Sequence, residues 1–574
     1  MSDIKRMILA GFLITGILLF LPYYLNLIGY IDPAQQQGLE DSPVSALNLK
    51  KNIPSPGSVE GAFLKKEAEK ELVNHRSQQE KTFIINTPKY SSTVSSLSGG
   101  SLTSYIITEN KSQYKGGYSF SGEYNDSAGV ELILNNRTLC APCVSVSSPS
   151  ETSLLSVPFS PVENLPSSLF LSEEDSLSLN FEHSNNLFTV KKTITFYGDS
   201  FIINHKAQVF SNSAFSIGLV WDKGLRPTEK NLVDAVSYAH ASLAEEKNIE
   251  NMFFAPSSFS EKKNPVKIDG VDWAAIRTKY FLMAMLPHKK EASFSSGVIS
   301  AESYDLSENN FVPSFSASLK ENSSILNYNL YLGPLDLDYV QELNPYLDRI
   351  MNFGWFILQP FSRSILWLLK FLHSFGINYG IILVLIAVFV RVVTGPLTKK
   401  SHQSAQKMQA IQPKLKKIQE KYKDNPKKLN QETINLYKES GTNPLGGCLP
   451  VLLQMPLLFA LFIVFRSTIE FRGASFFGWI SNLSQPDTIF FLPWNIPLYG
   501  DQVAFLPILL GITMFLSQSI SAATMDSKQK PLMYIMTGFF FLIFNSFPSG
   551  LNLYYVVYNF LNYLQLKSLK QPQG

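Results

Sequence analysis

Long blocks without a charged residue constrain the fold of this chain more than any other feature. A helix needs about 20 apolar residues to cross a hydrocarbon core about 30 Å thick. Four blocks each suit one crossing, and the last suits two because Asn545-Ser546-Phe547-Pro548-Ser549-Gly550 at its centre favours a turn. The blocks are Met7–Ile31, Phe371–Val390, Ser440–Phe465, Gln502–Met525 and Pro531–Leu566. We therefore predict an α-helical polytopic membrane protein with six transmembrane helices.

The positive residues between the blocks give the orientation. The first block follows Lys5 and Arg6, is longer than the core of a cleavable signal peptide and lacks a small-x-small cleavage site. We favour an uncleaved anchor, with a signal peptide as the alternative. If the N-terminus is cytoplasmic, so is the segment Ser401–Glu439, which carries nine lysines against four acidic residues. Because positive residues favour the cytoplasmic side, we predict that both termini lie there.

A large exported region separates the first two blocks. Phe188–Tyr197 and Phe201–Phe210 are rich in Thr, Val, Ile and Phe, and they flank Gly198-Asp199-Ser200, which predicts a β-hairpin. Four further runs have the same pattern: Ser104–Thr108, Val130–Leu134, Phe215–Trp221 and Lys279–Met285. Many short strands separated by turn residues predict a β-sandwich on the far side of the membrane.

These patterns divide the chain into five parts. We predict an N-terminal transmembrane anchor at 1–31, a flexible tether at 32–85, the β-sandwich domain at 86–340, an amphipathic interfacial helix at 341–372 and a five-helix core at 373–574. The interfacial helix follows from the aromatic and charged residues mixed in Pro345–Leu372. The core includes a cytoplasmic helical hairpin at 399–439.

Two cysteines of the exported region are close in sequence, in Cys140-Ala141-Pro142-Cys143. A redox centre would need a thioredoxin-like βαβ pattern around the pair, and the sequence shows none. We favour a local disulfide in an oxidising compartment, with the redox centre as the alternative.

Arg391 lies inside an apolar run that begins near Phe375 and ends before Lys399. A charge at mid-helix costs roughly 2.5–3.5 kcal/mol in lipid. None of the six predicted helices contains an Asp or Glu, so no ion-pair partner is available at membrane depth. The arginine therefore faces a hydrated cavity, or it extends along its own helix toward the headgroups near Thr398.

Neutral polar residues on the other predicted helices favour the cavity. The last helix has a polar stripe at i, i+3, i+7 and i+10, on one face. This stripe consists of Asn552, Tyr555, Asn559 and Asn562, with Tyr554 and Tyr558 beside it. Gln454 and Gln518 lie in the third and fourth helices. A polar stripe opposite an arginine predicts a water-filled groove inside the membrane.

The cytoplasmic segment has an apolar seam with the 3-4-3-4 spacing of packed helices. The seam consists of Met408, Ile411, Leu415, Ile418 and Tyr422. Asp424-Asn425-Pro426 interrupts it, which predicts a helical hairpin rather than a solvated linker. Lysines beside the seam form a predicted recruitment surface for ribosomes, headgroups or acidic substrates: Lys414, Lys416, Lys417 and Lys421.

Several classes of protein are disfavoured. An ion-coupled transporter normally needs an intramembrane acid, which the predicted helices lack. Ser549-Gly550 has no histidine nearby in the spans to act as a base for proteolysis, and no G-x-x-x-x-G-K-[ST] loop is present for nucleotide hydrolysis. A net charge of +3 is too even for a nucleic-acid binder. We predict a protein that is not an enzyme and that needs no cofactor or metal.

The C-terminal third resembles the YidC family of membrane insertases, which is related to the mitochondrial Oxa and chloroplast Albino insertases. The motifs that carry the resemblance are Arg391, Pro396-Leu397-Thr398-Lys399, Asn443-Pro444-Leu445-Gly446-Gly447-Cys448, Gln454-Met455-Pro456, Phe547-Pro548-Ser549-Gly550-Leu551 and Tyr554-Tyr555. The anchor and the exported β region are similar to those of the Gram-negative form.

The resemblance implies a function and a mechanism. Members of the family insert proteins into the bacterial inner membrane, and help them fold, through a groove that is open to cytoplasm and lipid. The groove arginine attracts the acidic or polar N-terminal region of a substrate. Arg391 matches that arginine, and Tyr554 and Tyr555 match an aromatic pair on the last helix. Ala387 stands where some relatives have a hydroxyl residue, so we expect no substrate contact there.

The resemblance also implies partners and a location. The expected partners are nascent inner-membrane proteins, the Sec translocon, the ribosome, the signal recognition pathway and the phospholipid bilayer. The protein is expected in the bacterial inner membrane, with its large domain, similar to a sugar mutarotase in fold, in the periplasm. The alternative function is a folding or assembly factor that holds membrane proteins without inserting them.

Overall fold

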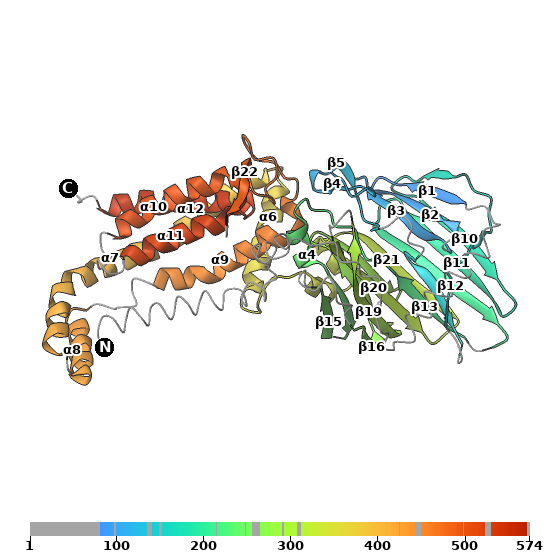
Figure 1. Ribbon diagram of the computed structural model, residues 1–574, viewed down its shortest axis with the longest axis horizontal. Coiled ribbons are helices and arrows are strands. Elements are labelled where there is room, and N and C mark those ends of the chain that lie inside the picture. Colours follow the sequence, from blue (N-terminus) through green and yellow to red (C-terminus); the bar gives the residue numbers. More distant parts are fainter. Residues whose placement is uncertain are drawn as a thin grey trace, which may run out of the picture. The chain divides into compact units, whose positions relative to one another are not determined.

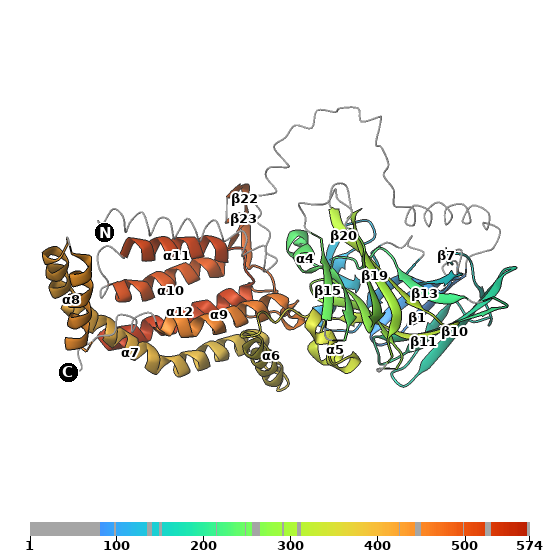
Figure 2. The ribbon, with the colours of Figure 1, turned by 90° about the horizontal axis from the view of Figure 1, so that it is seen from below.

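The computed structural model describes residues 81–570, apart from 97–98, 135–139, 149–151, 214, 247, 255–263, 290–291, 307–310, 424, 442–448, 497–498 and 523–529. The described residues form two compact units, a β unit up to Met351 and a helical unit from Asn352 (Figures 1 and 2). The predicted anchor at 1–31 and most of the predicted tether lie outside the described residues.

Three sheets build the β unit, one with nine strands and two with six. The nine-stranded sheet has the order β15-β14-β17-β18-β21-β12-β11-β10-β8. Its strands are β8 (Ser160–Pro161), β10 (Ser176–Ser184), β11 (Phe188–Tyr197), β12 (Ile202–Ser211), β14 (His240–Glu245), β15 (Asn248–Phe253), β17 (Trp273–Arg277), β18 (Phe281–Pro287) and β21 (Ile325–Pro334).

The two smaller sheets have the orders β4-β5-β3-β2-β1-β9 and β16-β19-β20-β13-β6-β7. The strands of the first are β1 (Thr82–Asn86), β2 (Tyr90–Ser95), β3 (Ser101–Ile107), β4 (Lys115–Tyr118), β5 (Tyr124–Glu131) and β9 (Ser168–Phe170). Those of the second are β6 (Cys143–Ser147), β7 (Thr152–Leu154), β13 (Ser216–Trp221), β16 (Val266–Val271), β19 (Phe294–Asp305) and β20 (Phe311–Glu321). Two short helices lie between strands, η2 (Ser112–Tyr114) and α4 (Leu232–Tyr238), and two follow the last strand, α5 (Leu337–Leu343) and η4 (Leu347–Ile350).

The predicted β-hairpin is confirmed. β11 pairs antiparallel with β12, from Phe188 opposite Ser211 to Thr195 opposite Asn204. Side chains alternate between the two faces of a strand, and β11 accordingly alternates buried residues with less buried ones along much of its length. The other four predicted runs overlap β3, β5, β13 and β18.

Two of the three sheets pack against each other, as predicted for a sandwich. β14 and β17 of the nine-stranded sheet contact β19 and β20 of a smaller sheet. Trp221 and Trp273 are almost fully buried in the β unit. Large aromatic side chains of this kind contribute most of the apolar area that holds two sheets together.

Seven helices and one small sheet make up the described part of the helical unit. The helices are α6 (Gln359–His373), α7 (Tyr379–Lys421), α8 (Pro426–Glu439), α9 (Leu449–Ser467), α10 (Phe505–Ala522), α11 (Lys530–Phe544) and α12 (Ser549–Lys570), with a short η5 (Ile469–Phe471). The small sheet pairs β22 (Thr488–Ile496) with β23 (Gly500–Ala504). The predicted turn in the last apolar block is confirmed, since α11 ends at Phe544 and α12 begins at Ser549.

The helix that carries Arg391 begins later than predicted. Residues 371–373 belong to α6, and α7 begins only at Tyr379. Gly376 has a positive φ of 77°, and the Asn378 side chain accepts a hydrogen bond from the Gly380 N–H, so the chain turns and a new helix starts. Hydrophobicity alone does not detect such a turn. α7 then continues for 43 residues through Pro396 into the predicted cytoplasmic arm.

Two other predicted boundaries are wrong. The predicted interfacial segment Pro345–Leu372 is not one helix, because Gly354 has a positive φ of 83° and α6 starts only at Gln359. The predicted fourth transmembrane block begins with a strand, because Gln502 pairs with Phe491 across the small sheet before α10 starts. Backbone pairing competes with helix formation at such apolar but β-branched and aromatic sequences.

Within the described chain, α7 is the one helix of 18 or more residues that is apolar enough to cross a membrane. Shorter apolar stretches lie at Met455–Ser467, Phe505–Ile520 and Met533–Phe544.

Candidate functional site

Arg391 lies on the face of α7 that is turned into the helical unit. The residue is only 6% exposed, whereas the next residue, Val392, is 69% exposed. Adjacent residues of a helix point in different directions. Arg391 is therefore directed into the helical unit, and Val392 is directed away from it. α7 packs along α12 in the helical unit.

Neutral groups surround the Arg391 guanidinium. Its Nη1 donates to Thr398 Oγ1 at 3.4 Å, and its Nη2 donates to Gln565 Oε1. The guanidinium carbon lies 5.6 Å from the centre of the Tyr558 ring, and Nε is buried without a hydrogen-bond partner. Across the described residues, no carboxylate forms an ion pair with Arg391. The positive charge is therefore solvated by neutral dipoles and an aromatic face.

Gln565 is a site residue that sequence analysis missed. Its Oε1 accepts from Arg391, and its Nε2 donates to the Gly395 carbonyl oxygen at 2.9 Å. One amide thus joins α12 to α7 through both of its polar atoms. Gln565 lies three residues after Asn562, the last residue of the predicted polar stripe. Extending the stripe by one helical turn would have found it.

Three tyrosines of α12 form an aromatic cluster beside the arginine. Tyr554, Tyr555 and Tyr558 are all buried. The Tyr554 ring stacks on Tyr558 with centres 6.0 Å apart, and it meets Tyr555 edge-on at 5.1 Å. The Tyr555 hydroxyl is buried without a hydrogen-bond partner in the described structure. The cluster extends the surroundings of Arg391 along α12.

The two predicted asparagines of α12 have other partners. Asn552 Nδ2 donates to the carbonyl oxygens of Phe544 and Phe547 at 3.1 and 3.3 Å, which holds the turn between α11 and α12. Asn559 Nδ2 donates to the Tyr555 carbonyl at 2.9 Å, within its own helix. Asn552 precedes Gln565 by 13 residues, about 20 Å along a helix. Asn552, the first residue of the predicted stripe, therefore has a structural role, whereas Gln565, one turn beyond its last residue, contacts Arg391.

The predicted glutamine of α10 has a partner other than Arg391. Gln518 Oε1 accepts from the Thr537 hydroxyl of α11. The adjacent Ser517 hydroxyl accepts from Asn562 of α12. Polar bonds of this kind hold membrane helices together. Gln454 lies on α9, but its side chain is outside the described residues.

The predicted apolar seam of the helical hairpin is confirmed. Ile411 is buried, and Leu415 and Ile418 are half-buried. α8 contacts α7 in this region and contributes the buried Leu436. All four lysines of the predicted recruitment surface are exposed: Lys414, Lys416, Lys417 and Lys421. The hairpin thus separates an apolar interior from a positively charged exterior.

Ser549 is not arranged as a nucleophile. It is fully buried, and its hydroxyl donates to the Asn482 carbonyl oxygen at 2.9 Å. A nucleophilic serine needs a base that can take its proton, which a carbonyl oxygen cannot do. The described residues also contain no group of three or more His, Cys, Asp or Glu side chains that could hold a metal ion.

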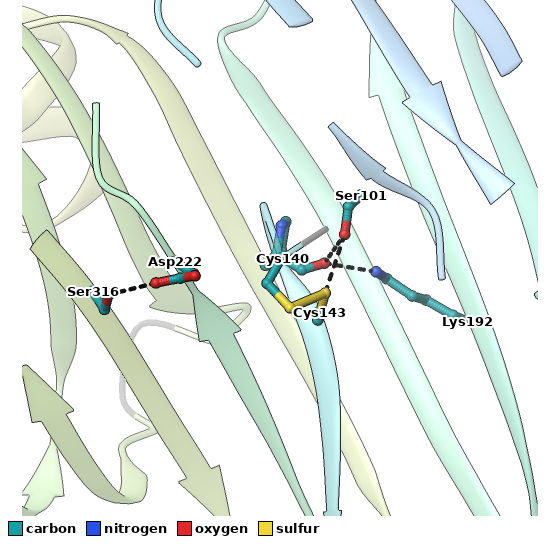
Figure 3. Close-up of a disulfide and its surroundings, with 7 residues drawn as sticks. Ser101, Cys140, Cys143, Lys192, Asp222 and Ser316 are labelled. Atoms are coloured by element: carbon teal, nitrogen blue, oxygen red, sulfur yellow. Dashed lines mark hydrogen bonds between the residues drawn. A yellow bond between two sulfur atoms is a disulfide. The ribbon is translucent and has the colours of Figure 1, made fainter. Parts of the chain in front are cut away.

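Cys140 and Cys143 form a disulfide in the β unit, next to a cis peptide bond between Ala141 and Pro142 (Figure 3). The pair lies at the start of β6, and the described residues around it form strands rather than a βαβ motif. The Pro142 carbonyl accepts hydrogen bonds from Ser101 Oγ at 3.0 Å and from Lys192 Nζ at 3.1 Å. The disulfide loop is therefore part of the sandwich core.

Two of the ionisable side chains that are buried in the β unit are Lys192, which bonds to this loop, and His205. Lys192 is 1% exposed, and burial lowers its pKa from 10.5 to about 7. His205 is fully buried and stacks on Tyr328 with ring centres 4.9 Å apart. Burial, and then the charge of Lys192, hold the pKa of His205 well below its usual 6.5. His205 is thus held in its neutral form at neutral pH, and Lys192 loses its charge as the pH rises through about 7.

Comparison with known protein families assigns both units. Residues 371–573 match the model of the 60Kd inner membrane protein family, and residues 159–368 match the model of the YidC periplasmic domain. The membrane protein insertase YidC of Chlorobium phaeovibrioides is 40% identical over 410 residues, which cover 67% of this chain and 67% of that protein. The membrane protein insertase YidC of Chlorobaculum tepidum is 30% identical over 550 residues, which cover 93% of this chain and 90% of that protein.

A crystal structure described as an active YidC insertase with its first transmembrane domain resolved also matches. It is 15% identical, with a TM-score of 0.34, over 86% of this chain and 93% of that one. The relatives named above are insertases, not enzymes, and the matched inner-membrane and periplasmic models cover most of the described residues. On this sequence similarity, the chain belongs to the YidC family of membrane protein insertases and is an inner-membrane protein with a β-rich periplasmic domain.

Proposed function

We propose that this protein inserts nascent membrane proteins through a groove in its helical unit that is lined by α7 and α12 and contains Arg391. The positive charge of Arg391 attracts the acidic or polar N-terminal region of a substrate from the cytoplasm. The apolar segment that follows then moves into the bilayer along the tyrosines of α12. The observation that carries the proposal is a buried arginine with no ion-pair partner among the described residues.

The physical basis is the cost of moving polar groups through hydrocarbon. Burying an unpaired polar group costs several kcal/mol, and burying an isolated charge costs far more. A groove that reaches partway into the membrane shortens the hydrocarbon path for the polar end of a substrate. An arginine with neutral partners can exchange Thr398 and Gln565 for a substrate carboxylate, which forms a stronger, charge-assisted pair. An arginine already paired with a carboxylate could not act in this way as easily.

The proposed membrane arrangement has six transmembrane helices with both termini in the cytoplasm. The parts are the anchor at 1–31, the tether at 32–85, the periplasmic domain at 86–340, the interfacial region at 341–372 and the core at 373–574. In this arrangement the hairpin at 399–439 is cytoplasmic, where its exposed lysines can meet ribosomes and arriving substrates. Cooperation with the Sec translocon and a role in folding inserted helices belong to the same proposal.

Site-specific crosslinking from Tyr555 tests the groove. Tyr555 is 7% exposed, whereas Phe560 on the same helix is 47% exposed and serves as the matched control position. A photoreactive residue at 555 should crosslink to ribosome-bound nascent chains during insertion, and more strongly than one at 560. Crosslinks only to helices that are already inserted would instead support the alternative, an assembly factor without insertion activity.

A further inference from the structure

Aromatic side chains cover the hairpin formed by β22 and β23, which connects η5 and the following loop to α10. The exposed apolar residues of β22 are Ile489, Phe490, Phe491 and Trp494, each at least 50% exposed. Phe490 pairs with Val503 and Phe491 with Gln502 in regular register. Because consecutive residues of a strand point to opposite faces, Phe490 and Phe491 make both faces of the hairpin apolar.

The second strand of the hairpin is held along its length by one buried side chain. Asn545 is fully buried in the turn between α11 and α12, and its side chain bonds to both ends of β23. Its Nδ2 donates to the carbonyls of Tyr499 and Gln502 at 2.8 and 2.6 Å, and its Oδ1 accepts from the Ala504 N–H at 3.1 Å. The exposed aromatic residues are therefore projected in a fixed direction rather than carried on a loose loop.

The direction of the hairpin is across the helices. Figures 1 and 2 both show β22 running transverse to α9, α10, α11 and α12, at one end of the helical unit. α6 lies across the helices at the same end, and Figure 2 shows it on the opposite side from β22. The outward face of α6 is also aromatic, with Trp367 64% exposed and stacked on Phe371. If α9 to α12 cross the membrane, both elements lie parallel to its surface.

The composition of the hairpin identifies the partner. Residues 488–504 contain no Lys, Arg, Glu or His, and Asp501 is their one charged residue. A groove in a protein would cover one face of a hairpin, whereas a lipid surface can surround both faces. Phe and Trp side chains are favoured where the acyl chains meet the headgroups. The absence of basic residues from this segment means that attraction to anionic headgroups contributes little.

We propose that the β22–β23 hairpin is a membrane-surface anchor, immersed on both faces at the boundary of headgroups and acyl chains, at the end of the helices where α6 lies. It fixes the depth and tilt of α10 and α11 in the bilayer from the side opposite α6. The proposal goes beyond the insertion mechanism, because it depends on the position of the helical unit in the membrane and not on the groove.

Depth measurement with a fluorescent label tests the proposal in the full-length protein. Single cysteines at Phe490→Cys and Phe491→Cys, in a Cys448→Ala background, carry an environment-sensitive dye in vesicles of neutral phosphatidylcholine. The matched control is Asn186→Cys, in the polar turn between β10 and β11. We expect dye at 490 and at 491 to be quenched several-fold less by aqueous iodide than dye at 186. Dye at 490 and dye at 491 should each be quenched more by a lipid nitroxide near the headgroups than by one at the acyl-chain end.

The competing outcomes are distinct. Iodide quenching equal to that at position 186 would show that the hairpin lies in water and would overturn the proposal. Protection from iodide without quenching by either lipid nitroxide would mean that protein, including a second copy of this chain, covers the hairpin. Lipid quenching at only one of the two positions would contradict immersion of both faces. Anionic lipid added to the vesicles should leave the quenching by the lipid nitroxides unchanged, and none of these readouts depends on insertion activity.

Discussion

The two units of this protein each bury a cation, and they treat it in opposite ways. In the β unit, Lys192 donates to the Pro142 carbonyl, and burial lowers its pKa to about 7, so that it can lose its charge. In the helical unit, Arg391 contacts Thr398, Gln565 and the Tyr558 ring. A guanidinium does not deprotonate in proteins. The cation of the β unit can therefore avoid the cost of a buried charge by losing its proton, whereas the cation of the helical unit keeps its charge.

The difference separates a structural cation from a functional one. Lys192 fills a place in a closed core, where a neutral amine with one hydrogen bond is sufficient. Arg391 lies between two helices of an insertase, with its Nε unpartnered and its other nitrogens on exchangeable side chains. A permanent charge in that position is costly to stability, which is the pattern expected where a site serves binding rather than packing.

Removing the retained charge should have the largest effect. We expect Arg391→Ala to reduce insertion of substrates with acidic N-terminal regions about tenfold or more, since a hydrogen bond to a charged group contributes about 1.5–3 kcal/mol. Protease protection of the translocated segment in proteoliposomes measures insertion. The control is Val392→Ala, the exposed neighbour on α7, which should insert normally. Normal insertion by Arg391→Ala would remove the arginine from the mechanism.

Changing the partner of the arginine should have a graded effect. Gln565→Glu places a carboxylate where the amide oxygen accepts from Arg391, and it should reduce insertion nearly as much as Arg391→Ala because it competes with the substrate. Gln565→Leu removes the amide contacts without adding a competing carboxylate, so the loss of insertion should be smaller, about fivefold for a change of about 1 kcal/mol. The same protease-protection assay compares the two variants. If leucine is the more damaging, Gln565 acts through packing rather than through charge.

Replacing Lys192, the cation that can lose its charge, should change the stability of the β unit and leave insertion unchanged. The pKa of Lys192 is about 7 in the folded protein and near 10.5 when unfolded. The unfolded state thus binds more protons between about pH 7 and 10.5, so the stability of the β unit rises with pH across that window. Lys192→Met should raise the unfolding temperature at pH 7, by about 2–4 °C for each kcal/mol gained.

Scanning calorimetry of the β-unit transition from pH 7 to 10 gives the test. The advantage of Lys192→Met over the unmodified protein should shrink as the pH rises, since the free-energy cost of releasing the Lys192 proton on folding falls as the pH approaches the unfolded pKa of 10.5. An advantage that is constant with pH would show that the methionine improves packing only.

Replacing the exposed lysines of the hairpin should have the smallest effect on function. Replacing Lys414, Lys416, Lys417 and Lys421 by glutamine should weaken capture of ribosomes or substrates modestly at low salt and little at high salt. Charges in water are screened over about 8 Å at physiological salt. Cosedimentation with ribosomes across a salt series measures capture.

Leu415→Asp and Ile418→Asp in the apolar seam should instead impair the hairpin at every salt concentration. Identical behaviour of the lysine variants and the seam variants would leave the hairpin without a separate electrostatic role.

Local sequence patterns were sufficient for the elements that depend on local chemistry. The antiparallel pairing of β11 with β12 follows from alternation around a turn, and the break between α11 and α12 follows from Pro548 and Gly550. The apolar seam of α7 follows from its 3-4-3-4 spacing. The identity of Arg391 as an unpaired charge follows from the lack of acidic residues in the predicted helices.

Features that depend on packing between elements could not be predicted in this way. The partner of Arg391 is Gln565, 174 residues away, and only the alignment of α7 with α12 brings them together. The fourth predicted block begins at Gln502, inside β23, because hydropathy does not distinguish a short apolar strand from the start of a helix. The late start of α7 depends on the turn at Gly376 and the cap at Asn378, which hydropathy does not register.

The pH dependence of Arg391→Lys tests the central claim, that Arg391 acts through a charge it cannot lose. A lysine buried without a carboxylate can give up its proton near neutral pH, as Lys192 does. We therefore measure insertion by the unmodified protein, Arg391→Lys and Arg391→Ala in the same vesicles between about pH 6 and 9, where an arginine stays charged. The account predicts that Arg391→Lys inserts nearly as well as the unmodified protein at the acidic end and falls toward Arg391→Ala at the alkaline end. Insertion by Arg391→Lys that stays at the level of Arg391→Ala throughout, even where the lysine is charged, would contradict it.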